Sequence, residues 1–222
     1  MRQNASSMTS AHTRLFLLVT LLTNPVWADG MIEGKITLDR PKPPAVKPGY
    51  KPDTQKPVQE EDAPRAIVYV ESSSGIYPES RTKQVLQIRQ EGYQFRPSFA
   101  VTQTGSKAEF PNRDDEFHNV FSYSRTRRFD LGRYRKGEPS PLISFDKPGL
   151  VKIYCEIHQH MRCLVLVVDT PWFTTTGIDG SFKIPKVPAG DYTLKALLPS
   201  EKTLQKAITI RDGATTSVQV SP

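Results

Sequence analysis

Short apolar segments alternate with turn-forming residues from Met31 to the end of the chain. Alternation of apolar and polar positions over short runs predicts half-buried β-strands. Outside the first 28 residues, no segment has convincing helical periodicity. Strands are predicted near residues 32–38, 66–71, 84–90, 108–110, 118–122, 142–145, 151–154 and 164–168. Many short strands at close spacing predict an all-β protein, built as a sandwich or a Greek-key barrel.

The pattern changes in two places along the chain. Residues 39–64 are rich in proline, lysine and glutamate and have no apolar periodicity, so we predict a solvated surface insertion. A second change occurs near Asp169, after which strands are predicted around 181–184, 187–194, 207–210 and 216–220. Asp179-Gly180 before an alternating run predicts a hairpin. About fifty residues is little for an independent core, so this tail should pack on the preceding domain or recruit 32–38 and 66–71.

The first 28 residues have the features of a secretory signal peptide. Basic residues precede the apolar run 15–22, and Val26 and Ala28 supply small side chains for cleavage after Ala28. The apolar run is short for a bilayer span, although an uncleaved membrane anchor is the alternative. No later segment is long and apolar enough to cross a membrane. We therefore expect an exported mature chain, periplasmic or secreted.

The sequence thus divides into four parts. They are the signal peptide 1–28, N-terminal strands with the proline-rich insertion 29–83, a central domain 84–169 and a C-terminal β-unit 170–222.

The charge of the chain bears on which macromolecular partners it could bind. The formal charge is +7, and removal of Arg2 and Arg14 with the leader lowers it to +5, from 28 basic and 23 acidic side chains. Nucleic-acid binders concentrate positive charge far more, so no nucleic acid is expected. A local basic cluster comprises Arg125, Arg127, Arg128, Arg133, Arg135 and Lys136. Such a cluster either steers an acidic protein partner or forms a solvated loop face.

The chemically informative segment is Tyr154-Cys155-Glu-Ile-His158-Gln-His-Met161, with the spacing C-x2-H-x2-M. The predicted strand 151–154 brings Cys155 to one end of a sandwich, and a tight turn returns His158 to the same point. A further histidine, His118, opens a predicted strand upstream. Two imidazoles, a thiolate and a weak axial thioether form a soft ligand set that copper prefers. We therefore predict one type 1 copper ion bound by His118, Cys155, His158 and Met161.

Three residues near this motif leave alternatives open. His160 competes with His158 as a ligand, but Met161 follows it too closely to bind the same metal comfortably. Asn119 either links the two ligand-bearing loops through its amide or is an ordinary turn asparagine. Cys155 could pair with Cys163, because exported proteins fold in an oxidising compartment. A disulfide sulfur cannot serve as a thiolate ligand, so we favour a metal-binding Cys155 and a free, buried Cys163 on the outgoing strand.

Residues 84–169 resemble a cupredoxin of the plastocyanin/amicyanin group. The resemblance depends on His118-Asn119-Val120, Asp146-Lys-Pro-Gly149 and the Cys155 loop, which is short like that of amicyanin. It implies a Greek-key β-sandwich with His118, Cys155 and His158 as equatorial ligands and Met161 as the axial one. It also implies that His158 lies nearest to solvent and is the electron port.

The wider layout resembles exported cupredoxin-like proteins of the methylamine-utilisation-like type. There the tail 170–222 is similar to a carboxypeptidase-regulatory-like, or transthyretin-like, β-unit with an Ig-like sandwich. Three features depart from the pattern: Phe117 replaces a proline before the first ligand, Cys163 is an extra thiol, and the insertion 39–64 has no counterpart in a minimal cupredoxin.

Together these features predict an exported blue copper protein that carries single electrons between periplasmic redox partners. Such a partner is expected to be a cytochrome or a dehydrogenase, and the basic cluster would suit an acidic one. One alternative is a copper carrier or sensor that does not shuttle electrons. Another is a metal-free structural β-module with Cys155 bonded to Cys163. An enzyme is not expected, because four side-chain ligands leave no open coordination position for a substrate.

Overall fold

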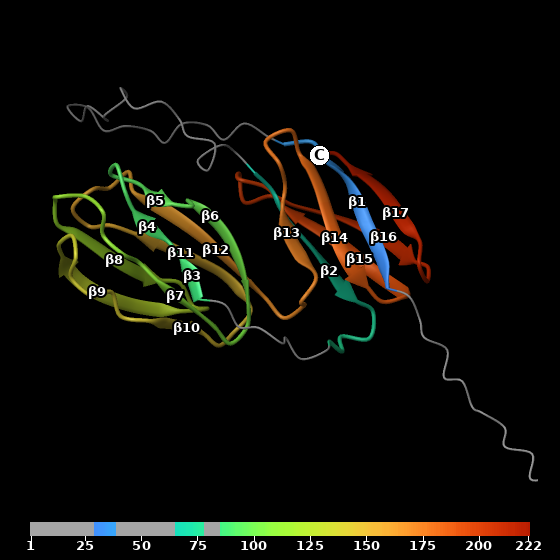
Figure 1. The fold of residues 1–222 in the computed structure, drawn as a ribbon, viewed down its shortest axis with the longest axis horizontal. Coiled ribbons are helices and arrows are strands. Elements are labelled where there is room, and N and C mark those ends of the chain that lie inside the picture. Colours follow the sequence, from blue (N-terminus) through green and yellow to red (C-terminus); the bar gives the residue numbers. More distant parts are fainter. Residues whose placement is uncertain (1–28, 39–64, 78–84) are drawn as a thin grey trace, which may run out of the picture.

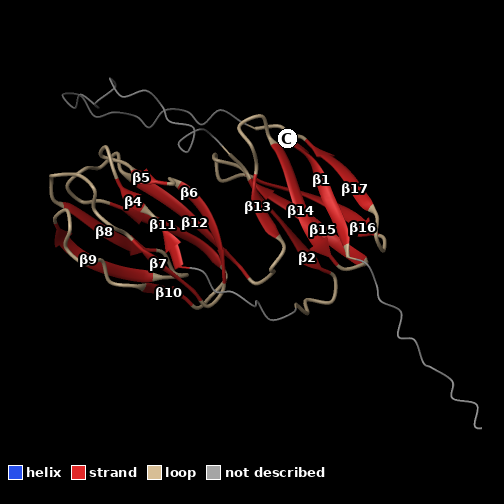
Figure 2. Cartoon of the chain, in the orientation of Figure 1, coloured by secondary structure: helices blue, strands red, loops and turns tan. Residues whose placement is uncertain are grey.

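The computed structural model describes residues 29–38, 65–77 and 85–222, and this part of the chain contains strands and no helix. The prediction of an all-β protein is therefore confirmed. The strands form two β-sandwiches, one on each side of Figure 1, and Figure 2 shows that loops connect them throughout. The predicted leader 1–28 and insertion 39–64 lie outside the described residues. Within the described residues, no helix has the length and apolar character needed to traverse a bilayer.

The first sandwich is built from the central part of the chain (Figure 1, left). Its larger sheet has the order β6 (Phe99–Gln103), β12 (Arg162–Val168), β11 (Gly149–Tyr154), β8 (His118–Tyr123) and β9 (Arg128–Tyr134). Its smaller sheet has the order β10 (Ile143–Phe145), β7 (Ser106–Glu109) and β3 (Val85–Gln87). A short pair, β4 (Arg89–Gln90) and β5 (Phe95–Arg96), flanks them.

The core of this sandwich follows from strict alternation along its central strands. In β11, Val151 and Ile153 are fully buried, and Lys152 and Tyr154, which alternate with them, are partly exposed. Ile153 lies opposite Cys163 of β12, which is buried on the same face. The two sheets share one apolar cluster, which also includes Phe145 of β10. Full burial of each such aliphatic side chain stabilises the fold by about 1.5–3 kcal/mol.

The second sandwich combines strands from both ends of the described chain (Figure 1, right). One sheet has the order β14 (Ser181–Val187), β1 (Gly30–Ile36) and β17 (Thr215–Val220). The other has the order β13 (Phe173–Thr175), β2 (Ile67–Ser72), β15 (Gly190–Leu197) and β16 (Thr203–Ile210). The C-terminal strands thus recruit the two N-terminal strands as inner members of both sheets, and the parts 29–83 and 170–222 share one core.

Local turn chemistry behaves as expected here, but its topological consequence does not. Gly180 has a positive φ of 83°, as the Asp-Gly turn requires. The predicted hairpin is nevertheless wrong, because β13 before the turn pairs with β2 while β14 after it pairs with β1. The turn therefore carries the chain from one sheet to the other. It joins the two layers of the sandwich rather than two neighbouring strands.

The two sandwiches pack against each other through a third apolar cluster. Leu166 and Val168, on the outer face of β12, contact Ile67 of β2 and Leu197 of β15 in this cluster. The four main sheets therefore form a continuous stack of layers. Beside the cluster, the Lys152 ammonium donates a hydrogen bond of 2.8 Å to the Glu201 carboxylate. The tail therefore packs on the preceding domain and also recruits β1 and β2 from the N-terminal part of the chain.

Four strands escaped the sequence analysis: β5, β6, β9 and β13. β9 lies within the basic cluster, so the interpretation of that whole cluster as a loop face is wrong. In β9, half-buried Phe129 and Leu131 pack against the core of the first sandwich and alternate with exposed Arg128 and Asp130. β9 is also an edge strand, with its other side unpaired among the described strands.

Candidate metal centre

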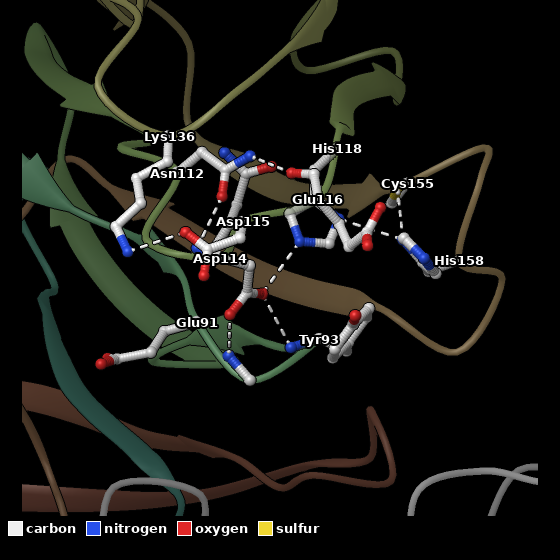
Figure 3. A network of polar contacts seen from close by, with 12 residues as sticks. Glu91, Tyr93, Asn112, Asp114, Asp115, Glu116, His118, Lys136, Cys155 and His158 are labelled. Carbon is white, nitrogen blue, oxygen red and sulfur yellow. Dashed lines mark hydrogen bonds and ion pairs between the residues drawn. The ribbon is translucent and has the colours of Figure 1, made fainter.

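Three predicted ligands meet at one end of the first sandwich (Figure 3). The Nδ1 atoms of His118 and His158 lie 3.0 Å apart, and the Cys155 sulfur lies 3.9 Å from Nδ1 of His158. The three ligand atoms all lie within 4.8 Å of one another. His118 and Cys155 are buried, and His158 is partly exposed. Two imidazole nitrogens and one sulfur thus face a common point.

Strand pairing explains why residues so far apart in sequence converge. β8 and β11 are neighbours, and Tyr154 at the end of β11 lies opposite Phe121 of β8. Cys155 follows Tyr154 directly, and His118 is the first residue of β8, so both emerge at the same end of the sheet. The turn after Cys155 is closed by a hydrogen bond of 2.9 Å from the Met161 N–H to the His158 carbonyl. The two-residue gaps in the motif fit this tight return into β12.

Asp114 orients His118, a role that the sequence analysis missed. Its Oδ2 accepts a hydrogen bond of 2.9 Å from Nε2 of His118 (Figure 3). The same carboxylate accepts hydrogen bonds from the N–H groups of Gly92, at 2.6 Å, and Tyr93, at 2.9 Å. A proton held on Nε2 leaves Nδ1 with a free lone pair facing His158 and Cys155, an arrangement typical of metal-binding histidines. The available signal was the D-x3-H spacing from Asp114 to His118.

A buried asparagine fixes the loop that carries Asp114. Asn112 is only 3% exposed, and its Nδ2 donates to the carbonyls of Glu116, at 2.8 Å, and Tyr134, at 3.0 Å. Its Oδ1 accepts a hydrogen bond of 2.9 Å from the N–H of Asp114. These three hydrogen bonds hold the loop to itself and to β9. The position of the carboxylate beside His118 is set by the fold rather than by a flexible side chain.

Asn119 lies between the two ligand-bearing segments. Its backbone N–H points at the Cys155 sulfur over 3.5 Å, and its Oδ1 accepts a hydrogen bond of 3.4 Å from the N–H of Glu156. Its Nδ2 donates to Asp130 at 2.8 Å and to the carbonyl of Gly132 at 3.2 Å. Backbone N–H donors to a cysteine sulfur stabilise the thiolate form. Asn119 thus contacts β8, β9 and the Cys155 loop at once.

The electrostatics of the site favour a thiolate beside a protonatable histidine. Burial alone would raise the pKa of the Cys155 thiol, but the contacts with His118 and with the Asn119 N–H outweigh it and lower that pKa. Burial alone would lower the pKa of His118, but its contacts with Cys155 and Asp114 raise it. For Asp114, hydrogen bonds from Tyr93, Gly92 and His118 overcome burial and lower the pKa. The Cys155 thiolate and the Asp114 carboxylate therefore carry negative charge that a bound cation would neutralise.

His158 and His160 behave differently from His118. Burial, followed by the charges of His118 and His160, lowers the pKa of His158 and favours its neutral, ligating form. His160 has its ring centroid 6.1 Å from that of His158 and hydrogen bonds to the backbone of Tyr93. It does not belong to the cluster of His118, Cys155 and His158. Of the two competing histidines, the structure brings His158 to the common point.

Met161 and Tyr93 contribute apolar and aromatic surroundings to the centre. Met161 is fully buried and packs in the same apolar cluster as Cys155. The Tyr93 ring meets both imidazoles edge-on, with centroids 5.8 Å from His118 and 5.1 Å from His158. These contacts surround the polar ligand atoms with apolar and aromatic groups. Such a shell limits water access and lowers the local dielectric constant.

The surface around His158 is apolar at its centre. His158 lines a shallow pocket with Phe117, Ile157, Glu116 and Arg133. The side chains of Phe117 and Ile157 are 39% and 40% exposed, so both present apolar surface to solvent. Charged groups border this patch, including the ion pair from Arg133 to Glu156 at 2.7 Å.

The second thiol is separate from the centre. Cys163 is 1% exposed, and burial raises its pKa. Its thiol donates a weak hydrogen bond to the carbonyl of Pro97 at 3.4 Å. Both cysteines are free, so the prediction of a free, buried Cys163 on the outgoing strand is confirmed.

Comparisons with known proteins give distant structural likenesses only. No family model and no curated protein matches the chain. Similar solved structures include a copper-containing nitrite reductase from Thermus scotoductus SA-01, at 22% identity and a TM-score of 0.36, over 41% of this chain and 24% of that one. A purple cupredoxin from Nitrosopumilus maritimus has 21% identity and a TM-score of 0.34, over 37% of this chain and 98% of that one. An oxidised amicyanin variant has 16% identity and a TM-score of 0.34, over 46% and 97%.

These likenesses each extend over less than half of this chain, and this chain spans about a quarter of the nitrite reductase. They are too distant to carry a functional argument. What the chain can bind depends on its own donors, and a set of two imidazoles and one thiol, gathered at one point in a mostly apolar shell, fits a soft transition metal such as copper.

Proposed function

We propose that this protein is an exported type 1 copper protein that carries single electrons between protein partners. The observation that carries the proposal is the convergence of His118, Cys155 and His158, whose ligand atoms lie within 4.8 Å of one another. Buried Met161, three residues after His158, is proposed as the weak axial ligand. When bound, copper would supply a one-electron change in oxidation state that no side chain of the site provides by itself.

The chain's own contribution would be a site that does not need to rearrange. Asp114 holds the His118 ring through Nε2, and Asn119 holds the Cys155 loop through Glu156. Both residues are in turn fixed by backbone groups. A coordination sphere held in this way changes little between oxidation states, which keeps the barrier to electron transfer low.

His158 is proposed as the point where electrons enter or leave. It is the only one of the three clustered ligands that is not buried, and the apolar patch of Phe117 and Ile157 surrounds it. A partner that covers this patch would approach the centre closely while excluding water. The partners are proposed to be periplasmic proteins such as a cytochrome or a dehydrogenase, reached after cleavage of residues 1–28.

The second sandwich is proposed to be structural and similar to a carboxypeptidase-regulatory-like, or transthyretin-like, unit. Its buried core is apolar, and the cluster of metal-binding side chains lies entirely in the first sandwich. No catalytic role is proposed for either sandwich.

The test is reconstitution of the mature chain with cupric salt, with the optical spectrum and the metal content as readouts. Wild type should bind one copper ion and show an intense visible band from the thiolate. The Cys155→Ser variant should lose that band, whereas Cys163→Ser, which removes the other buried thiol, should retain it. A wild-type protein that stays colourless, or a Cys155–Cys163 disulfide detected by mass spectrometry, would overturn the proposal.

The same material separates an electron carrier from a copper-delivery protein. An electron carrier should release its copper slowly to a competing thiol ligand and should cycle repeatedly between oxidised and reduced forms. Rapid and complete transfer of copper to the competitor would favour delivery or sensing instead.

A further inference from the structure

β9 divides the basic cluster into two groups with different surroundings. At its end near the metal centre, Arg133 pairs with Glu156 at 2.7 Å, and Lys136 pairs with Asp115 at 3.0 Å. Arg135 lies over the Phe117 ring at 4.2 Å. Arg133 and Lys136 thus already have carboxylate partners within the protein. Two of the three cations at this end therefore offer less free charge to another molecule.

At the other end, the turn from β8 to β9 presents Arg125, Arg127 and Arg128. Arg128 begins β9 and Tyr134 ends it, so this turn lies about 20 Å from the metal end at 3.3 Å per residue. Among the residues that the structure describes, no carboxylate pairs with any of these three arginines. The Nε of Arg127 is buried and has no hydrogen-bond acceptor.

A group of aromatic side chains lies beside Arg128, the last of these arginines. Phe121 packs against Tyr123, with centroids 5.2 Å apart, and against Tyr154, at 5.9 Å. The Arg128 guanidinium lies 5.7 Å from the centre of the Tyr123 ring. Tyr123 is the last residue of β8 and is 65% exposed. We call Phe121, Tyr123, Tyr154, Arg125, Arg127 and Arg128 the aromatic–arginine surface.

This surface occupies the half of the sheet that the second sandwich leaves uncovered. The apolar cluster between the sandwiches involves β6, β12 and the start of β11 on the outer face of the five-stranded sheet. Phe121, Tyr123 and Tyr154 belong to the same outer face, farther toward the edge strand β9. In Figure 1, β8 and β9 lie on the side of the first sandwich away from the second.

We propose that the aromatic–arginine surface docks an acidic segment of a protein partner. Guanidinium groups that no carboxylate pairs with bind a partner's carboxylates in bidentate geometry. Tyrosine and arginine are the residue types that dominate binding energy at protein interfaces. The docking does not require copper, so it goes beyond the proposed electron transfer and can be tested separately from it.

A protein partner fits this surface better than an anionic membrane does. Asp130 lies directly opposite Phe121 across the β8–β9 pair and is exposed on the same face. A bilayer surface would bring lipid phosphates against this carboxylate, whereas a folded partner can place a donor or cation there. Asp130 is also fixed in place by hydrogen bonds from Asn119 and from the N–H of Gly132.

The test uses the mature chain and a fluorescein-labelled peptide rich in Asp and Glu that contains one tryptophan, followed by fluorescence anisotropy. Arg125→Ala combined with Arg128→Ala should weaken binding about tenfold or more, as loss of interface arginines does. Tyr123→Ser should weaken it by about fivefold, because the exposed ring supplies contact area. Arg127 is left intact because its side chain is partly buried, so its removal would also change the packing beneath the surface.

The matched control removes the same charge elsewhere. Lys107 lies on the opposite sheet of the first sandwich and Lys206 on the second sandwich, and both are exposed. Lys107→Ala combined with Lys206→Ala should change the peptide affinity less than twofold. Equal losses for the two double variants would show that only net charge matters and would overturn the proposal, as would no peptide binding by wild type.

Two further arms separate the remaining explanations. Binding to vesicles of phosphatidylglycerol and phosphatidylcholine should not depend on Arg125 and Arg128, and a loss confined to vesicles would assign the surface to a membrane instead. Copper-loaded and copper-free proteins should bind the peptide equally. Failure of the copper proposal would therefore leave this result unchanged.

Discussion

The two sandwiches have the same construction but bury different kinds of side chain. Each consists of two sheets around one apolar cluster. Of the ten buried polar residues among those described, eight lie in the first sandwich and two, Thr170 and Thr176, lie near or in the second. The eight are Gln90, Arg96, Thr102, Ser106, Asn112, His118, Asn119 and Ser122.

This difference shows that the destabilising burial of polar groups is concentrated in the sandwich that bears the metal centre. A buried polar group destabilises a fold unless hydrogen bonds compensate for its lost hydration. In the first sandwich, Asn112, Asp114, His118 and Asn119 compensate one another and the backbone around a single point. The second sandwich carries no comparable cluster in its described part. Its apolar core stabilises the second sandwich. Through the cluster between the sandwiches, the second sandwich also supports the sheet that bears the site.

The largest expected effect is a loss of stability when a core side chain of the second sandwich is truncated. Leu194 of β15 is fully buried there, and Leu194→Ala should lower the free energy of unfolding by about 2–5 kcal/mol. The measurement is denaturant unfolding followed by circular dichroism. The copper spectrum of the folded variant should not change, because no ligand or ligand-holding residue contacts this core. An altered visible band would show that the two sandwiches are not functionally separate.

A smaller effect on affinity should come from the first sandwich, at Asp114. Asp114→Asn removes the charge that three donors share and should weaken copper binding by about 10- to 100-fold. Competition with a chromophoric copper chelator measures the change. The control is Asp115→Asn, since that neighbouring carboxylate is 90% exposed and pairs only with Lys136. Equal losses for both variants would mean that the general negative charge of the loop, rather than the orientation of His118, supports the metal.

The parts of the site that the sequence could indicate are those encoded locally. Cys155, His158 and Met161 belong to one turn, and their spacing alone places them at one strand end. His118 could be added because it opens an apolar strand. Asp114 could not be assigned its role, because that role depends on the packing of its loop against the N–H groups of Gly92 and Tyr93, more than twenty residues earlier.

The fold shows the same limit. Alternation revealed most strands of both cores. β9 was hidden because its outward positions are arginine and aspartate and its inward ones are only half-buried. Asp179-Gly180 fixes the backbone of a turn, yet it does not determine which sheet the next strand joins. The proximity of residues 30–36 and 67–72 to the C-terminal strands is likewise a non-local property. Pairing partners distant in sequence are set by the burial of whole faces, which a local pattern does not specify.

The smallest effect concerns the contact between the sandwiches outside their apolar cluster. The side chains of Lys152 and Glu201 are 40% and 42% exposed, so water screens their attraction and their ordering costs conformational entropy. A double-mutant cycle of Lys152→Ala and Glu201→Ala, read by denaturant unfolding, should therefore give a coupling energy of about 0.2–1 kcal/mol. In this view the apolar contacts of Leu166 and Val168 with the second sandwich hold the two parts together. A coupling energy well above that range would instead assign the alignment of the two sandwiches to the ion pair, and the second sandwich would then be more than an apolar support.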